Sequence, residues 1–532
     1  MNEQTPQESG AVDDGMERLD ELNRRLDWSE RLGGADAVAR EHQRGRLTVR
    51  ERIERLVDAD SFREVGRLAG RGDYIDGQIG HVVPASYVAG LAKINGRSVA
   101  VGGEDFTIRG GTNTSAGRRK GGQGGFIEDL AHHYRVPLIN LCQGGGGSVT
   151  ALTRKGHAPL PGEDGLERSI DLLGSVPVVG ALMGPSAGGP ALRAIFSHFS
   201  LMPRNTAQIM IAGPRVVTRA IGEELSAEEL GGAAVAVDQA GTIDNAYDSE
   251  PECLDAIRSF LSYLPQNVWE LPPLGPRLDP QNRLTPELRD IVPARRTKPY
   301  NMHKLVDLVM DRDSLFEIQP TYGKPVICLL ARLNGVPVGV VAHNPMVNGG
   351  SLNVAAARKQ RHFVDLCNTF HLPLIYFVDT PGFMVGSRAE SEAMMREGLR
   401  CLQACAEVSV PVLTLIIRKC YGAAGMMTQH KNGIDLKVAW PSGEWGSLPL
   451  EGGIAVAFGR EIQTAPDPVV RERELEETVK MLTSPFRTAE AFGIEDIIDP
   501  AATRPYLSAF IDVARESMRH STGPKALVGV RP

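Results

Sequence analysis

The sequence predicts an α/β protein in which one fold is used twice. Short runs of Val, Ile and Leu alternate with segments whose apolar residues recur at helical spacing, which is typical of layered α/β structures. Several sequence blocks also recur in the same order in both halves of the chain. Because a repeated order at nearly constant spacing indicates duplication, we expect two domains of similar topology.

The first repeated block is an Asn-Gly turn followed by a strand and a glycine pair. Asn95-Gly96 precedes Gly110-Gly111, and Asn334-Gly335 precedes Gly349-Gly350, 239 residues later in each case. Asn-Gly between apolar runs marks a turn.

Two further blocks follow the same order. Val136-Pro137-Leu138-Ile139 matches Leu372-Pro373-Leu374-Ile375 at an offset of 236, and Ser175-Val176-Pro177-Val178 matches Ser409-Val410-Pro411-Val412 at 234. The offset drifts by only five residues across the series. Each half therefore reads as an Asn-Gly turn, a strand, a glycine pair, and then helices and strands joined by glycine-rich or Pro-Gly turns.

The remaining segments set the domain limits. Apolar spacing predicts two helices between residues 35 and 60, and eight of the 35 prolines fall between Pro265 and Pro299, which predicts an extended connector. We expect a loose tail over residues 1–30, a first domain over 31–280 and a second over 281–532.

Composition excludes several classes of protein. The 532 residues are 42% hydrophobic, no apolar run approaches the ~20 residues needed to span a bilayer, and the formal net charge is −7. These values argue against a membrane protein and against a general nucleic-acid binder. Seven cysteines form no regular framework and the first residues lack a targeting signal, so we expect a cytoplasmic location.

Glycine-rich turns that follow strands are the main chemical signal. They are Gly144–Gly147, Gly184–Gly189 and the run from Tyr421 to Gly425. A turn that opens a helix directs free backbone N–H groups at one point, and such donors stabilise an oxyanion. No catalytic triad or carboxylate pair accompanies them. Doubled turns of this kind suit chemistry on two carbonyl groups, one held by each half.

Other motifs leave alternatives open. Gly184-Pro185-Ser186-Ala187-Gly188 has the nucleophile-elbow pattern, so Ser186 is a rival nucleophile. Asp379 ends a strand and is a base, a metal ligand or a turn cap. Arg118-Arg119-Lys120 is either a polyphosphate contact or a solvated run of charge. No metal site is expected, because Cys401 and Cys405 have no second pair of ligands.

At these residues the chain resembles the carboxyltransferase (β) subunit of biotin-dependent acyl-CoA carboxylases. The motifs that carry the resemblance are Gln43-Arg-Gly-Arg-Leu-Thr-Val-Arg-Glu-Arg-Ile, Glu104-Asp-Phe-Thr, Gly184-Pro-Ser-Ala-Gly-Gly, Gly213-Pro-Arg-Val-Val, Glu228-Glu-Leu-Gly-Gly, Phe260-Leu-Ser-Tyr-Leu-Pro, Thr380-Pro-Gly-Phe, Arg418-Lys-Cys-Tyr-Gly and Ala439-Trp-Pro-Ser. The resemblance implies two tandem crotonase-like domains of the ββα superhelix type. It also implies a hexamer with each site between opposing halves of two subunits.

The resemblance further implies a division of labour. Acyl-CoA is the substrate of the first half, with its thioester oxygen held by the catalytic N–H groups of Gly145 and Gly146. Arg118, Arg119, Lys120, Gly188, Gly189 and Met426 are the implied substrate-binding residues. Biotin, carried as carboxybiotin by a biotin carboxylase or biotin carboxyl carrier partner, sits in the second half. There Ala423 and Ala424 hold its carbonyl, beside Gly422, Gly425, Thr380, Gly382 and Phe383.

The implied mechanism needs no acid or base from the protein. Carboxybiotin releases CO2, the biotin anion takes the acyl α-proton, and the enolate attacks CO2. Two departures from the family pattern stand out: Gly147 replaces the usual Arg, and Met426 replaces a charged pocket residue. Three alternatives remain at this stage: a biotin-dependent decarboxylase subunit, a serine acyl hydrolase using Ser186, and a catalytically silent scaffold for a biotin carrier.

Overall fold

The structure is a computed structural model that describes residues 9–112, 125–146, 156–157, 166–428 and 436–525. The chain divides into two compact units. Unit 1 contains residues 1–172, 178–236 and 246–258, and unit 2 contains residues 173–177, 237–245 and 259–532. The Pro-rich segment 265–299, in which we expected the domain boundary, therefore belongs to unit 2.

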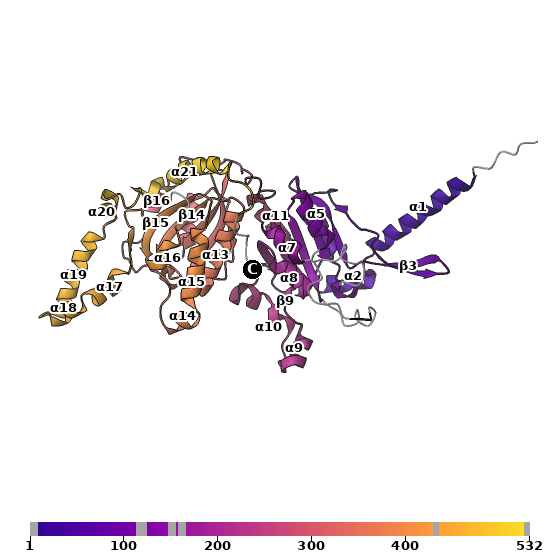
Figure 1. The fold of residues 1–532 in the computed structure, drawn as a ribbon, viewed down its shortest axis with the longest axis horizontal. Helices are drawn as coiled ribbons and strands as arrows, with labels where there is room; N and C mark the ends of the chain where they lie inside the picture. The colour runs from indigo at the N-terminus through magenta and orange to yellow at the C-terminus, as the bar shows by residue number, and fades with distance from the viewer. Residues whose placement is uncertain (1–8, 113–124, 147–155, 158–165, 429–435, 526–532) are drawn as a thin grey trace, which may run out of the picture. The chain divides into compact units, whose positions relative to one another are not determined.

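The first sheet follows a set of N-terminal helices (Figure 1). The elements in chain order are α1 (Ser9–Glu30), α2 (Ala35–Gln43), α3 (Val49–Leu56), β1 (Arg63–Glu64), β2 (Gly70–Ile75), β3 (Gln78–Pro84), β4 (Tyr87–Ile94), β5 (Arg97–Glu104), η1 (Arg109–Gly111), α5 (Phe126–Tyr134), β6 (Leu138–Gly144), α7 (Leu166–Leu173), β7 (Val178–Ala187), α8 (Gly189–Ile195), β8 (Phe199–Pro203), β9 (Gln208–Met210), α9 (Pro214–Ile221), α10 (Ala227–Gly231), the π-helix η2 (Ala234–Gln239), β10 (Asn245–Tyr247) and α11 (Glu250–Tyr263).

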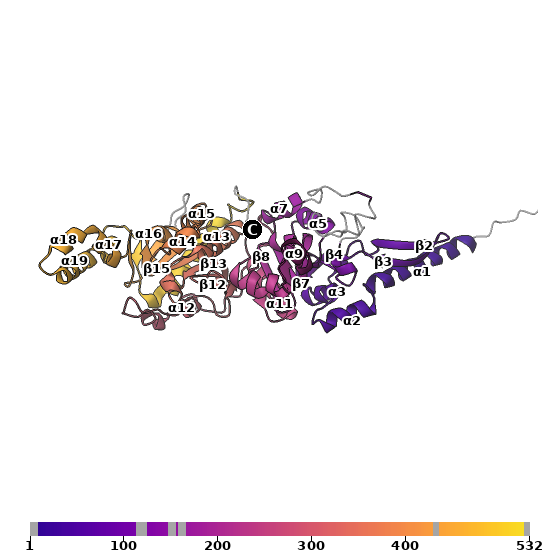
Figure 2. The ribbon, with the colours of Figure 1, turned by 90° about the horizontal axis from the view of Figure 1, so that it is seen from below.

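The second sheet and its helices occupy the rest of the chain, as Figure 2 shows from a second direction. They are η3 (Pro286–Arg289), α12 (Met302–Val309), β11 (Phe316–Ile318), β12 (Val326–Leu333), β13 (Val336–His343), η4 (Asn348–Gly350), α13 (Val354–Thr369), β14 (Leu374–Thr380), α14 (Ser387–Ser391), α15 (Met394–Ala406), β15 (Val412–Tyr421), α16 (Gly422–Met426), β16 (Leu436–Ala439), β17 (Glu444–Gly446), α17 (Leu450–Ala457), α18 (Gly459–Thr464), α19 (Pro468–Leu482), α20 (Pro485–Glu490), β18 (Asp496–Ile497), η5 (Pro500–Ala502) and α21 (Thr503–Met518).

The two eight-stranded sheets have the same topology, which confirms the predicted α/β fold used twice. Their strand orders are β1-β4-β5-β6-β7-β8-β10, with β9 beside β7, and β11-β12-β13-β14-β15-β16-β18, with β17 beside β15. In both sheets an antiparallel hairpin leads into parallel strands. The carboxyl ends of those parallel strands are where α/β sheets usually bind ligands.

The matching Asn-Gly turns are the clearest trace of duplication. Both residues of each turn have positive φ: 50° and 76° at Asn95-Gly96, and 52° and 76° at Asn334-Gly335. Each pair of N–H groups donates to one carboxylate, that of Asp58 at 2.9 and 2.8 Å or that of Asp311 at 3.0 and 2.7 Å. The turn geometry is therefore repeated together with its acceptor.

The N-terminal helices differ partly from expectation. Residues 9–30, expected as part of a loose tail, form helix α1. Trp28 near its end stacks edge-on against His81 of β3, with ring centroids 5.7 Å apart. This long-range contact helps to hold the end of the helix and is not readable from local composition. The two helices expected between residues 35 and 60 are α2 and α3.

Each sheet is buried in its own unit. In unit 2 the core joins the strands β12–β16 to α12 and α21, with Leu305, Phe377, Trp440, Leu507 and Ile511 among its members. None of the helices in the described part of the chain combines the length and the apolar character needed to cross a membrane.

Candidate functional site

The central parallel strands of both sheets share an irregularity at their carboxyl ends. In unit 1 the register between β6 and β7 shifts between Cys142 and Gly144, and in unit 2 the register between β14 and β15 shifts between Val378 and Thr380. After the shift Gly144 pairs with Ser186, and Thr380 pairs with Cys420. Bulges of this kind redirect the chain beside functional sites.

The glycine-rich turns follow directly from these strand ends. Gly188 and Gly422 occupy equivalent positions, 234 residues apart, and both have left-handed backbones with φ of 62° and 59°. Glycine adopts this conformation without steric cost. Gly188 is the residue before helix α8, and Gly422 is the first residue of helix α16. The first N–H groups of each helix have no acceptor within it.

The donors available at these turns are the N–H groups of Gly188 and Gly189 in unit 1 and of Ala423 and Ala424 in unit 2. No acceptor for any of them occurs among the residues that the structure describes. Pro190, the residue after Gly189, has no N–H to offer. The α8 turn therefore offers the adjacent N–H groups of Gly188 and Gly189.

Gly145 and Gly146 do not form the pair of donors that we expected. The Gly145 N–H donates to the carbonyl oxygen of Gly110 at 3.1 Å, so it is already occupied. The position equivalent to Gly145 in the second half is Pro381, which has no N–H at all. Gly146, with φ of 76°, packs so closely on the α8 turn that an added Cβ would lie 2.7 Å from the Ala187 carbonyl oxygen. This loop supports the α8 turn.

The residues expected around biotin lie beside the α16 turn of unit 2. The Thr380 hydroxyl donates to the Gly350 carbonyl at 2.8 Å and accepts from the Gly382 N–H at 3.2 Å, which fixes the Pro-Gly turn. Phe383 packs on Gly398 of α15, where a Cβ would come within 2.6 Å of its ring. Gly425 lies against the Cys420 thiol, at a distance of 2.9 Å for an added Cβ.

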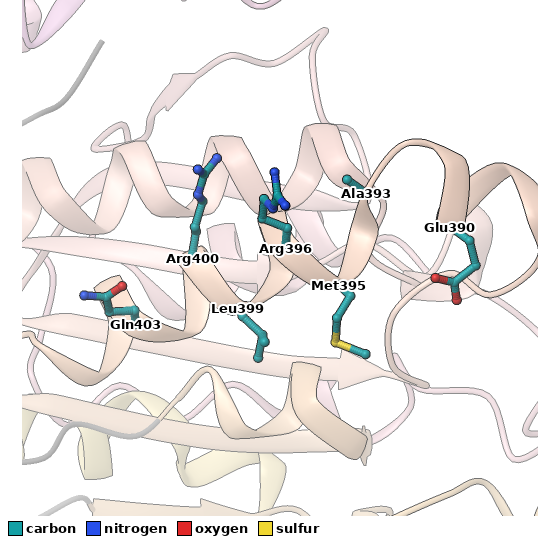
Figure 3. Close-up of a pocket in the computed structure, with 7 residues that line it drawn as sticks. All are labelled: Glu390, Ala393, Met395, Arg396, Leu399, Arg400 and Gln403. Carbon is teal, nitrogen blue, oxygen red and sulfur yellow. The ribbon is translucent and has the colours of Figure 1, made fainter.

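Met426 ends helix α16 and is 48% exposed, so its thioether is free to contact a ligand. The neighbouring helix α15 has a shallow hollow on its exposed side of about 650 Å³. Figure 3 shows Arg396 and Arg400 projecting to one side of that helix, with Met395 and Leu399 on another. These side chains are exposed at the surface, and none belongs to the predicted set of site residues.

Ser186 is not placed as a nucleophile. Its side chain is fully buried, and its hydroxyl donates to the carbonyl oxygens of Gly184 at 3.2 Å and Cys142 at 3.3 Å. The strand register makes Cys420 its equivalent, and burial raises the pKa of that thiol to about 11. Among the residues that the structure describes, neither side chain has an activating base as a hydrogen-bond partner, so the hydrolase alternative is not supported.

Asp379 is a structural anion. Its buried carboxylate pairs with the Arg418 guanidinium at 2.9 Å and accepts from the Lys419 N–H at 3.1 Å, across the β14–β15 bulge. The Arg418 guanidinium also lies over the Tyr300 ring, 5.0 Å from its centroid. Burial and the Asp379 charge raise the pKa of Tyr300 well above its ordinary value. No group of three metal-binding side chains occurs in the described residues.

Sequence reasoning missed a buried polar network beneath the bulge of unit 1. Arg52 of α3 binds Glu250 of α11 through two hydrogen bonds of 2.7 and 2.8 Å. It also donates to the Gln143 side chain at 2.6 Å and to the Met183 carbonyl at 2.9 Å. The sequence signal for Arg52 was its place in the arginine-rich motif that begins at Gln43.

The basic tract Arg118-Arg119-Lys120 and Gly147 lie outside the described residues. The other predicted residues fall into two groups, one in each unit. Gly145, Gly146, Gly188 and Gly189 surround the α8 turn of unit 1. Thr380, Gly382, Phe383 and residues 422–426 surround the α16 turn of unit 2.

Comparison with known proteins identifies similar sequences and structures. Residues 40–527 match the family model described as the carboxyl transferase domain. The propionyl-CoA carboxylase carboxyltransferase subunit of Haloferax mediterranei is 33% identical over 513 residues, covering 96% of this chain and 98% of that protein.

Two solved structures extend the comparison. The transcarboxylase 12S hexamer with methylmalonyl-coenzyme A and methylmalonic acid bound superposes with a TM-score of 0.86 at 29% identity, covering 100% of this chain and 99% of that one. A single-chain, multi-domain long-chain acyl-CoA carboxylase gives a TM-score of 0.77 at 28% identity, over 92% of this chain and 50% of that one. The family match covers nearly the whole chain, and the chain belongs to the carboxyl transferase family of enzymes, whose members move carboxyl groups.

Proposed function

We propose that this chain transfers a carboxyl group between carboxybiotin and the α-carbon of an acyl-CoA, as the carboxyltransferase subunit of an acyl-CoA carboxylase. The observation that carries the proposal is the doubled turn. Two equivalent strand ends each open a short helix with free N–H donors, one in each unit. Two such turns match the two carbonyl oxygens, thioester and ureido, that become more negative during the transfer.

In unit 1 we assign the thioester oxygen to the turn at Gly188 and Gly189. This assignment replaces the pair Gly145 and Gly146, because the Gly145 N–H is bonded to Gly110. It also follows from the duplication, since the α8 turn is the structural equivalent of the α16 turn. Each such donor contributes about 2.7–4 kcal/mol to transition-state stabilisation in comparable sites.

In unit 2 we assign the biotin carbonyl to Ala423 and Ala424, beside Gly422, Gly425, Thr380, Gly382 and Phe383. The Pro-Gly turn held by Thr380 fixes one wall of this site. We propose that biotin arrives on a biotin carboxylase or biotin carrier partner. It would supply the transferred carboxyl group and accept the α-proton. The residues named here bind and orient; none is required to exchange a proton.

The assembly is proposed from the relatives. The 12S protein is a hexamer, and we propose a hexamer of this chain that binds a biotin carboxylase or carrier subunit. We also propose the domain limits 31–280 and 281–532 as units of function, one for each substrate.

The test is carboxyl transfer from methylmalonyl-CoA to free biotin by the purified chain. We expect carboxybiotin and propionyl-CoA to form in equal amounts, with saturation in both substrates. Absence of transfer to free biotin and to a biotin carrier protein, with methylmalonyl-CoA and with longer carboxyacyl-CoA esters as donors, would refute the proposal. Hydrolysis of the thioester without biotin would indicate an acyl hydrolase instead.

A further inference from the structure

In each unit a buried guanidinium bonds to the two strands that form the bulge, β6 and β7 in unit 1 and β14 and β15 in unit 2. The two guanidinium groups come from residues at different places in the fold. In unit 1 Gln143 sits at the bulge of β6, between the pairs Cys142–Leu182 and Gly144–Ser186, and its side chain lies against Gly184 of β7. In unit 2 the equivalent residues are Asp379 of β14 and Arg418 of β15. The two halves thus have the same backbone irregularity and unrelated side chains within it.

In unit 1 the guanidinium comes from a helix. Arg52 is 1% exposed and joins three elements at once: β6 through Gln143, β7 through the Met183 carbonyl, and α11 through Glu250. Gly184 leaves the room that the Gln143 side chain needs, because a Cβ there would lie 2.6 Å from the Gln143 Cδ. An arginine at position 184, as at 418, would not fit this arrangement.

The network continues to the turn itself. The Gln143 N–H donates to the Glu104 carboxylate at 3.2 Å, and Glu104 forms a buried ion pair with Arg193 of α8. The Gln143 amide also donates to Glu41, which pairs with Arg46 at 2.8 Å. Helix α8 is the helix opened by Gly188. Movement of the bulge would therefore move the first turn of that helix.

In unit 2 the guanidinium comes from the strand itself. Arg418 bonds to Asp379 across the bulge at 2.9 Å and to the Lys298 carbonyl at 3.0 Å, and its side chain is 6% exposed. The Lys419 N–H donates to the same carboxylate at 3.1 Å, so backbone and side chain hold it together. Three residues after Lys419 the chain enters helix α16.

We propose that Arg52 and Arg418 are positioning residues, Arg52 for the acyl-CoA turn and Arg418 for the biotin turn. Each holds two strand ends in fixed spacing through bidentate or multiple charge-assisted hydrogen bonds, for which a planar guanidinium is suited and a lysine ammonium is not. A misplacement of about 1 Å in such a site costs up to about 100-fold in rate. The inference rests on the proposed function of the two turns.

The proposal requires that the two arginines affect different substrates. The experiment is the transfer from methylmalonyl-CoA to free biotin, with kcat and KM measured for each substrate in Arg52→Lys and Arg418→Lys. Because kcat is common to both substrates, the two KM values carry the distinction. We expect Arg52→Lys to lower kcat by about 10- to 100-fold and to raise the KM for the CoA ester, with the KM for biotin within twofold of wild type. We expect Arg418→Lys to raise the KM for biotin instead.

Two further variants test the same proposal if the lysine variants do not fold. Gln143→Met removes the acceptor of Arg52 and leaves its pair with Glu250, and Asp379→Asn removes the charge opposite Arg418 and keeps its shape. The same division between substrates is expected. Arg50→Lys, two residues before Arg52 and paired with Glu64 at 2.9 Å, is the matched control in unit 1. Arg504→Lys, fully buried and paired with Asp311 at 2.7 Å, is the control in unit 2.

The outcomes are distinguishable. Equal changes of the two KM values in every variant and control would show that these arginines only stabilise the fold, and would overturn the proposal. Unchanged kinetics in folded Arg52→Lys and Arg418→Lys would also overturn it. If wild type transfers nothing to biotin or to a carrier, the proposed function itself fails, and the positioning roles fail with it.

Discussion

Gly189 offers a substitution that removes one backbone N–H and little else. It is the first residue of α8, where proline is tolerated because the N–H has no acceptor within the helix. Nothing lies within 4 Å of a Cβ added at this position. Gly189→Pro therefore deletes the proposed thioester donor, while Gly189→Ala keeps that donor and adds a similar β-carbon.

The expected loss follows from the energy of one oxyanion donor. Removing about 2.7–4 kcal/mol of transition-state stabilisation lowers kcat for Gly189→Pro by about 100- to 1,000-fold. For Gly189→Ala we expect less than about a fivefold change. Because the thioester oxygen gains charge mainly in the transition state, most of the effect should appear in kcat rather than in KM for the CoA ester.

Gly145→Pro is the comparison that separates the two candidate loops. Its N–H is bonded to the Gly110 carbonyl, and the equivalent residue in the second half is already Pro381. We expect the variant to lose about 1 kcal/mol of stability, the net value of one hydrogen bond, and to keep most of its rate. The assay is transfer from methylmalonyl-CoA to free biotin, with folding monitored by thermal unfolding. A fast Gly189→Pro together with a slow Gly145→Pro would refute the assignment.

Four further predictions concern single features of the chain. The wild type should favour acyl groups larger than propionyl, and Met426→Asp should shift the preference toward shorter acyl groups, because a carboxylate beside an apolar tail loses its hydration. Turnover across a series of acyl chain lengths tests this, and a wild-type preference for acetyl-CoA would contradict it. Ser186→Ala should keep most of the transfer rate, since its hydroxyl only bonds two carbonyls, whereas a thousandfold loss would support covalent catalysis. Alanine at Arg118, Arg119 and Lys120 should raise the KM for acyl-CoA and weaken its salt dependence, and unchanged kinetics would mark the tract as solvated. Burial lowers the pKa of His343 to about 4 from 6.5, so as pH falls the unfolded chain binds a proton there before the folded chain does, and the free energy of unfolding should decline by about 3 kcal/mol between pH 6.5 and pH 4. His343→Phe should lose less stability than wild type on acidification. The measurement is the thermal unfolding midpoint against pH, with the exposed His303→Gln as control.

Much of the fold could be predicted because its signals are local. Asn95-Gly96 and Asn334-Gly335 require positive φ, and that requirement is visible in the residue types. The α8 and α16 turns follow from glycines placed directly after buried strands. The duplication was readable because insertions between its blocks are short.

The missed features depend on contacts between distant residues. Arg52 meets partners 91, 131 and 198 residues away in the chain, so no window of sequence reveals its role. The Gly145 N–H is occupied only because the Gly110 carbonyl lies beside it. The equivalence of Ser186 and Cys420 depends on two strand bulges that composition does not show.

The shared bulge has a consequence for how the two halves can change. The backbone shift at Gln143 is repeated at Asp379, but one is secured from a helix near the N-terminus and the other from within its own strand. A substitution of Arg52 weakens the bulge at Gln143 and leaves the bulge at Asp379 unchanged, and a substitution of Arg418 does the opposite. With the proposed positioning roles, selection or a protein engineer can alter one turn while the other keeps its shape, and the duplicated chain then consists of two separately adjustable modules.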